Sequence, residues 1–149
     1  MSYLLYLREA EGQKMKTPDS SVRRILVVED EPSISDVCRR VLTREGYAVE
    51  IAANGKLAQC MVGEKPYDLC LIDIRMPELN GKGLYEWLLE KYPQLAKRVI
   101  FTTGDMLGVD TKSFIEGTGR PCLPKPFSLG DLKAIVRETL QNQIDSSIR

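Results

Sequence analysis

The feature that most constrains the fold is an alternation of short apolar runs with longer segments whose apolar residues have helical spacing. The run 25–28 (Ile-Leu-Val-Val) is continuously apolar, as in a strand buried on both faces of a sheet. The next segment has the three- and four-residue spacing of a helix, with apolar side chains at Ile34, Val37, Cys38, Val41 and Leu42. Ser33 is the expected N-cap of this helix, and Gly46 is expected just beyond its end.

The same strand and helix unit repeats along the chain. Further strands are expected at 48–52, 69–73, 99–102 and 121–123, and further helices at 55–62, 83–92, 111–116 and 129–140. Strands that alternate with helices predict a parallel sheet with helices on both faces. Pro121 and Pro124 bracket the last strand, which therefore belongs at an edge. The predicted fold is α/β, with one doubly wound five-stranded parallel sheet in the order 2-1-3-4-5.

The length of 149 residues fits a single domain, which we expect at 23–141. Residues 1–22 start with an apolar run at 3–7 (Tyr-Leu-Leu-Tyr-Leu) and then turn polar, which predicts a strand remnant followed by a linker. Residues 142–149 are expected to form a C-terminal tail. The apolar run is far shorter than the roughly 20 residues of a membrane span, so we expect a cytoplasmic protein without membrane contact.

Charge, histidine and cysteine content exclude several functions. Lys plus Arg and Asp plus Glu are equal at 21 each, which gives no net attraction to nucleic acid. The chain has no histidine, so it lacks a Ser-His-Asp arrangement, and any phosphohistidine must come from another protein. The cysteines form no C-x-x-C pair and are expected to be reduced core thiols: Cys38, Cys60, Cys70 and Cys122.

Charged and hydroxyl side chains follow four of the predicted strands. The acidic triplet 29–31 follows the first strand, Asp73 ends the third, Thr103 and Gly104 follow the fourth, and Lys125 follows the fifth. In an open parallel sheet, ligands bind beyond the carboxyl ends of the strands, where the strand order reverses. We therefore expect these residues to converge on one site.

This set of residues has the parts that phosphoryl transfer needs. Crowded carboxylates repel each other unless a cation neutralises them, and Mg²⁺ is bound by carboxylates, water and phosphate oxygens. Lys125 offers a compact positive charge, Thr103 a hydroxyl, and Gly104 an accessible backbone N–H. Singly, each residue also has an ordinary structural explanation, such as an acidic helix N-terminus or a solvated lysine. Their joint placement favours a functional site, where a carboxylate nucleophile would form an aspartyl phosphate.

Four motifs carry a resemblance to a known family: I-L-V-V-E-D-E-P at 25–32, L-I-D-I-R-M-P-E-L-N-G at 71–81, T-T-G at 102–104 and L-P-K-P-F at 123–127. They resemble the receiver domain of two-component response regulators, a flavodoxin-like fold, over about 23–141. The resemblance implies that Asp73 accepts a phosphoryl group from a histidine kinase or a histidine phosphotransfer domain. Such a protein is a signalling receiver rather than a conventional enzyme, although it catalyses its own phosphorylation and dephosphorylation.

The resemblance also assigns the remaining site residues. Glu29 and Asp30 would form the acid pocket for Mg²⁺, with Asp30, Asp73 and the backbone carbonyl of Arg75 as direct ligands. Thr103 and Lys125 would hold the phosphoryl oxygens and report occupancy to the face formed by the last two helices and the last strand. The bond between Lys125 and Pro126 would be cis.

Three details refine the resemblance. Cys122 stands where the family often has an aromatic residue, so an aromatic rotation is doubtful as the switching device. The segments 98–105 and 119–127 most resemble receivers fused to hybrid sensor histidine kinases, which favours an excised C-terminal receiver over a free-standing one. Arg75 and Asp105 are further predicted to pair across the mouth of the site.

Three alternatives share parts of this pattern. A flavin mononucleotide-binding module would need a phosphate loop after the first strand, where the acidic triplet would repel phosphate. A haloacid-dehalogenase-like phosphatase would need a second aspartate two residues after the nucleophile, where this chain has Arg75. An interaction module without phosphorylation is disfavoured because every charged position that the chemistry needs is present.

Overall fold

The computed structural model describes residues 21–76, 78–104 and 108–148, with side chains as far as Asn142. Its five parallel strands lie in the order β2-β1-β3-β4-β5, and their bounds are β1 (Arg24–Val28), β2 (Ala48–Ala52), β3 (Leu69–Asp73), β4 (Val99–Thr103) and β5 (Cys122–Pro124). The predicted sheet order and the edge position of β5 are confirmed. The strand remnant predicted at 3–7 lies outside the described residues.

Helices follow the strands as predicted, with differences at their ends. Their bounds are α2 (Pro32–Arg44), α3 (Gly55–Glu64), α4 (Gly81–Lys91), α5 (Pro93–Ala96), α6 (Val109–Thr118) and α7 (Leu129–Ile148). The prediction of Ser33 as N-cap is wrong: Glu31 is the N-cap of α2, and Pro32 occupies the first turn, where its fixed φ suits a helix. The short α5 was not predicted because four residues show no periodicity. Helix α7 runs eight residues beyond the predicted end at 140.

The turn from α2 to β2 depends on Gly46. Its φ is +97°, in the left-handed region that a side chain disfavours, and its N–H donates to the carbonyl of Thr43 over 3.0 Å. This agrees with the sequence-based prediction that a glycine follows the end of α2.

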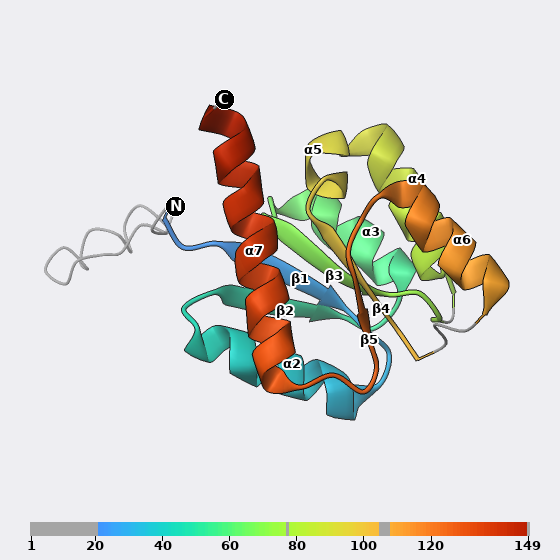
Figure 1. Cartoon of the computed structure of the whole chain (residues 1–149), viewed down its shortest axis with the longest axis horizontal. Coiled ribbons are helices and arrows are strands. Elements are labelled where there is room, and N and C mark those ends of the chain that lie inside the picture. Colours follow the sequence, from blue (N-terminus) through green and yellow to red (C-terminus); the bar gives the residue numbers. More distant parts are fainter. Residues whose placement is uncertain (1–20, 77, 105–107, 149) are drawn as a thin grey trace, which may run out of the picture.

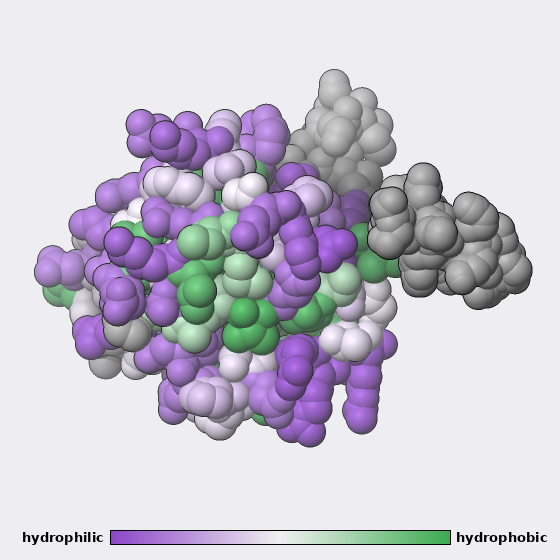
Figure 2. Space-filling view, turned by 180° about the vertical axis from the view of Figure 1, so that it is seen from behind, coloured by the Kyte–Doolittle hydropathy of each residue, from purple (hydrophilic) through white to green (hydrophobic). Residues whose placement is uncertain are grey.

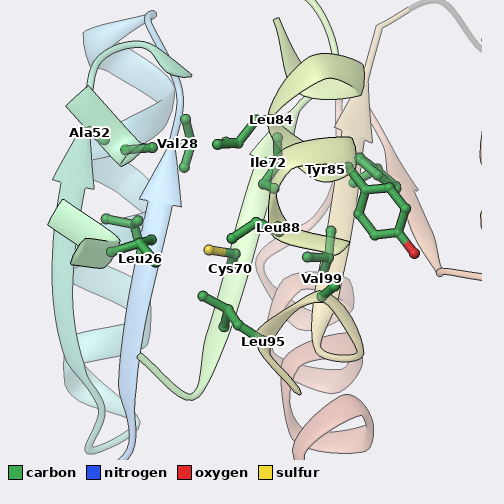
Figure 3. Packing of buried hydrophobic residues seen from close by; sticks show 14 of the residues in the cluster. Leu26, Val28, Ala52, Cys70, Ile72, Leu84, Tyr85, Leu88, Leu95 and Val99 are labelled. Atoms are coloured by element: carbon green, nitrogen blue, oxygen red, sulfur yellow. The ribbon is translucent and has the colours of Figure 1, made fainter. Parts of the chain in front are cut away.

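The sheet lies between helices on both of its faces (Figure 1), and an apolar layer packs on each face. On one face, Leu42 of α2 and Leu132 and Val136 of α7 pack against alternate residues of the strands. On the other face, α3, α4 and α6 cover the strands. Figure 3 shows Leu84 and Leu88 of α4 directed at the side chains of Cys70 and Ile72 on β3. The continuously apolar runs are therefore buried from both sides, as the sequence predicted.

The cysteines divide between core and surface. Cys38 and Cys70 are buried free thiols, and burial raises the pKa of Cys70 to about 12, which makes it inert. The prediction of a core position is wrong for Cys60, which lies exposed on α3.

Seen from behind, the molecule shows an apolar area ringed by hydrophilic side chains (Figure 2). Among the described helices, none has the length and apolar character that crossing a membrane requires.

Candidate functional site

Strand register brings the polar residues to the same edge of the sheet. Ile72 pairs with Val28 on one side, Asp73 pairs with Thr102 on the other, and Thr103 pairs with Pro124. Because the strands are parallel, the residues that follow β1 and β5 lie beside Asp73 and Thr103. The predicted convergence of the four strand ends is therefore present in the structure.

Three carboxylates cluster at this edge. One carboxylate oxygen each from Glu29, Asp30 and Asp73 lies within 4.8 Å of the others. Glu29 and Asp73 are buried, at 4% and 5% exposure, whereas Asp30 faces solvent. Burial in so small a volume makes the mutual repulsion of these groups costly unless positive charge compensates it.

Lys125 supplies the compensating charge within the protein. Its Nζ lies 2.9 Å from Glu29 Oε1 and 3.3 Å from Asp73 Oδ2, and its side chain is 17% exposed. Lys125 therefore lies between both acids and closer to Glu29 than to Asp73. The peptide bond after Lys125 is cis, as the resemblance implied.

Burial and charge act in opposite directions on these groups. Burial raises the pKa of the Glu29 carboxyl, and the Asp73 charge adds to this, against the opposing hydrogen bond from Lys125. Burial alone would lower the pKa of Lys125, but the hydrogen bond to Glu29 and the charge of Asp73 raise it. Lys125 therefore stays charged, while Glu29 ionises less readily than an ordinary glutamate.

Backbone groups orient the two buried acids, and the sequence-based reasoning missed them. The N–H of Arg75 donates to Asp73 Oδ1 over 3.2 Å, and the N–H of Glu31 donates to Glu29 Oε2 over 3.1 Å. Asp73 Oδ2 is then the oxygen that faces Lys125. Both donors lie two residues after the acid that they hold, a spacing that could have signalled them.

Gly81 is a second feature that the sequence analysis did not assign to the site. A Cβ built on Gly81 would lie 2.6 Å from the carbonyl oxygen of Asp73, closer than real Cβ contacts allow. The glycine lets α4 start directly against the end of β3, and its N–H donates to the carbonyl of Ile74. It thereby fixes the backbone around Asp73.

The remaining predicted residues line the same region. Thr103 is buried beside β5, and the space around the Cα of exposed Gly104 is open, which suits the approach of an anion. The Arg75 side chain is exposed at a hollow beside α6. Asp105, its predicted partner, lies outside the described residues, so their pairing stays a prediction.

The donor set fits a hard divalent cation. All three clustered ligands are carboxylates, the type that Mg²⁺ and Ca²⁺ bind, and the described part of the chain contributes neither histidine nor thiol to the cluster. Exposed Asp30 leaves one side of the cluster open to water and to a further ligand. An ion with several water ligands suits this half-open arrangement.

Comparison with known proteins identifies the family that the geometry resembles. Residues 25–137 match the family described as the response regulator receiver domain. The chain is 29% identical over 124 residues to response regulator ArlR of Staphylococcus epidermidis and 33% identical over 119 residues to transcriptional regulatory protein TcrA of Mycobacterium tuberculosis. These alignments cover 83% and 76% of the chain but 55% and 44% of the relatives, so the chain spans about half of their length.

Solved structures agree with this result. A CheY-like receiver domain protein from Methanospirillum hungatei superimposes with a TM-score of 0.77 at 29% identity, over 84% of this chain and 98% of that one. The receiver domain of a signal transduction histidine kinase from Syntrophus aciditrophicus gives 0.74 at 28% identity, over 81% and 92%. Regulators and a kinase thus both contain similar receivers, and the hybrid-kinase assignment stays a prediction.

Proposed function

The chain belongs to the response regulator receiver family, and from this membership we propose that Asp73 accepts a phosphoryl group from a phosphohistidine on a partner protein. The observation that carries the proposal is the arrangement of Asp73. It is a buried carboxylate at the end of β3, oriented by a backbone N–H and placed beside one lysine and two further acids. An ordinary structural aspartate has no need of such surroundings.

The proposed reaction is a transfer between two proteins. A carboxylate oxygen of Asp73 forms a bond to phosphorus while the bond from phosphorus to the donor's imidazole nitrogen breaks, and the electron pair of that bond stays on the nitrogen. Lys125 lies 3.3 Å from Asp73 and can pair with a phosphoryl oxygen once the acyl phosphate forms. Thr103 and the backbone of Gly104 are the proposed donors to the other oxygens.

Glu29, Asp30, Asp73 and the carbonyl of Arg75 would hold Mg²⁺ in this proposal. The ion would neutralise charge that builds up on the phosphoryl oxygens. Glu29 is the most buried of the three acids and is already held by Lys125 and the N–H of Glu31, so it would act mainly through water ligands of the ion. Exposed Asp30 is the more accessible direct ligand.

The donor protein needs a surface beside the acceptor. A hollow of about 400 Å³ next to Lys125 is lined by apolar residues of α2 and of the loop after β5, among them Ile34, Val37 and Phe127. Apolar contact there would bring a partner helix within reach of Asp73. The output step stays a proposal as well: the face of α6, β5 and α7 would respond to occupancy through Thr103 and Lys125.

The direct test is phosphorylation by a small acyl phosphate with Mg²⁺, followed by intact-mass measurement. The unaltered chain should gain one phosphoryl group and Asp73→Asn should gain none. Asp36→Asn is the matched control, because Asp36 is an exposed helix residue paired with Arg39 and Arg40. Undiminished incorporation in Asp73→Asn would refute the assignment, and no incorporation in the unaltered chain would favour an interaction module.

A further inference from the structure

Another hollow lies at the opposite end of the sheet from Asp73. It has a volume of about 490 Å³ and forms where the end of α3, the segment before β3 and the short helix α5 meet. Its walls are largely apolar and aromatic: Val62, Pro66, Tyr67, Tyr92, Pro93 and Leu95. This size falls within the range of roughly 300 to 1,000 Å³ that is typical of small-molecule sites.

Arg98 gives this hollow an unsatisfied positive group. Its Nε is shielded from solvent and, within the described residues, is the only buried side-chain nitrogen or oxygen without a hydrogen-bond partner. The backbone of Arg98 is held firmly, since its N–H donates to Leu95 and its carbonyl accepts from Cys70. Buried donors nearly always have an acceptor, and the described residues supply none here.

The other charges around the hollow restrict the kind of acceptor. The ammonium of Lys65 lies 2.6 Å from Glu50, and the hydroxyl of Tyr67 also donates to Glu50, so neither needs a ligand. Glu64 is the carboxylate on the lining, and no ion pair joins it to Arg98 in the described part of the chain. One unpaired cation beside one carboxylate favours a single negative charge and disfavours a polyanion.

We propose that this hollow binds a small molecule with one carboxylate on a flat aromatic body. The carboxylate would accept from the Nε–H and the adjacent Nη–H of Arg98 in the two-point geometry that guanidinium and carboxylate share. The ring would lie against the proline and tyrosine walls. Tyr92, which is 36% exposed and packs at a tilt against Trp87, forms part of the wall that the ring would contact.

This site is separate from the phosphorylation chemistry. Tyr67 and Arg98 precede β3 and β4, whereas Asp73 and Thr103 end these strands. The proposal therefore does not rest on the proposed function, and Asp73→Asn should bind the same ligand equally well.

Benzoate is the probe, with ¹⁵N-labelled protein and amide chemical shifts as the readout. Saturable shifts should appear at 62–67 and 92–98, in the millimolar range expected of so small a ligand. Acetate has the charge without the ring and benzyl alcohol the ring without the charge, so each should bind about tenfold more weakly. No saturable shift with benzoate, or equal binding of benzyl alcohol, would overturn the proposal.

Variants of neighbouring charges locate the contact. Arg98→Gln should weaken benzoate binding by about tenfold, the loss expected for one charge-assisted hydrogen bond. Lys97→Gln is the matched control, because Lys97 is exposed and lies outside this hollow. Glu64→Gln should strengthen binding by about twofold and keeps the test informative if Arg98→Gln does not fold. Equal weakening in Lys97→Gln, or weaker binding in Glu64→Gln, would contradict the inference.

Discussion

The two ends of the sheet handle charge in opposite ways. At the carboxyl end, Glu29, Asp30 and Asp73 cluster together, and Lys125 pairs with two of them, Glu29 and Asp73. Towards the amino end, Glu50 of β2 lies 2.6 Å from Lys65 and 3.8 Å from Arg24, and it accepts the hydroxyl of Tyr67. One end therefore holds an excess of negative charge and the other surrounds a single acid with donors.

This difference between the two ends bears on the function proposed for the carboxyl end. The excess at the carboxyl end disfavours the ionised state of Glu29, whose pKa burial raises. The hydrogen bond from Lys65 lowers the pKa of Glu50, and the bond from Tyr67 adds to this. A fold gains nothing from unbalanced buried charge, and its presence at the carboxyl end supports the proposal that a cation and a phosphoryl group bind there.

The largest expected effect comes from removing the cation at each end. Lys125→Met leaves Glu29 and Asp73 buried and uncompensated, which should lower the free energy of unfolding by about 3 kcal/mol in chelator. Lys65→Met removes an ammonium that is 47% exposed and should lower it by about 0 to 1 kcal/mol. Urea denaturation measures both.

Lys125→Arg is the control for that comparison, because it keeps the charge while changing the shape. It should lose less stability than Lys125→Met. Equal losses of stability in Lys125→Met and Lys65→Met would mean that the two ends of the sheet depend equally on their cations.

A smaller effect is expected from adding the cation that is proposed to bind at the carboxyl end. Mg²⁺ at ten times its dissociation constant should stabilise the unaltered chain by about 1.4 kcal/mol, since it binds the folded state. Asp30→Asn should lose most of this gain, and should be more stable than the unaltered chain in chelator because one repelling charge is gone. Thermal unfolding with and without Mg²⁺ tests this, and an unchanged Mg²⁺ response would exclude Asp30 as a ligand.

The sequence predicted the sheet, its order and the convergence at its carboxyl end because these follow from local patterns. Continuous apolar runs identify buried strands, and parallel strands must bring residues such as Asp73 and Thr103 to one edge. Contacts that depend on three-dimensional packing were not predictable in this way. The closer approach of Lys125 to Glu29 and the tight fit of Gly81 on Asp73 depend on loop paths.

The amino end of the sheet was missed for a similar reason. The contacts there join Glu50 on β2 to Lys65 and Tyr67, which lie between α3 and β3. No sequence spacing links these residues. No sequence pattern distinguishes Arg98 from an ordinary surface cation, and only packing shows that its Nε is enclosed. Contacts between residues at strand ends are easier to predict from sequence than contacts between residues in irregular segments.

The smallest expected effect concerns the change of stability with pH, to which Glu50 and Glu29 should contribute with opposite signs. Because the pKa of Glu50 is lowered in the folded state, its contribution is fully present above the ordinary value of 4.5 and is lost as the pH falls through the folded-state pKa. Glu50→Gln should therefore lower stability at neutral pH by about 0 to 1 kcal/mol, in line with its partly exposed partners, and flatten the decline in acid. The pKa of Glu29 is raised, so its protonated form contributes stability below 4.5 that is lost as the pH rises through the folded-state pKa. In chelator, Glu29→Gln should remove that loss and raise stability at neutral pH. Urea denaturation across a pH series on both sides of 4.5 measures the two slopes, and changes of the same sign in both variants would contradict the contrast between the two ends of the sheet.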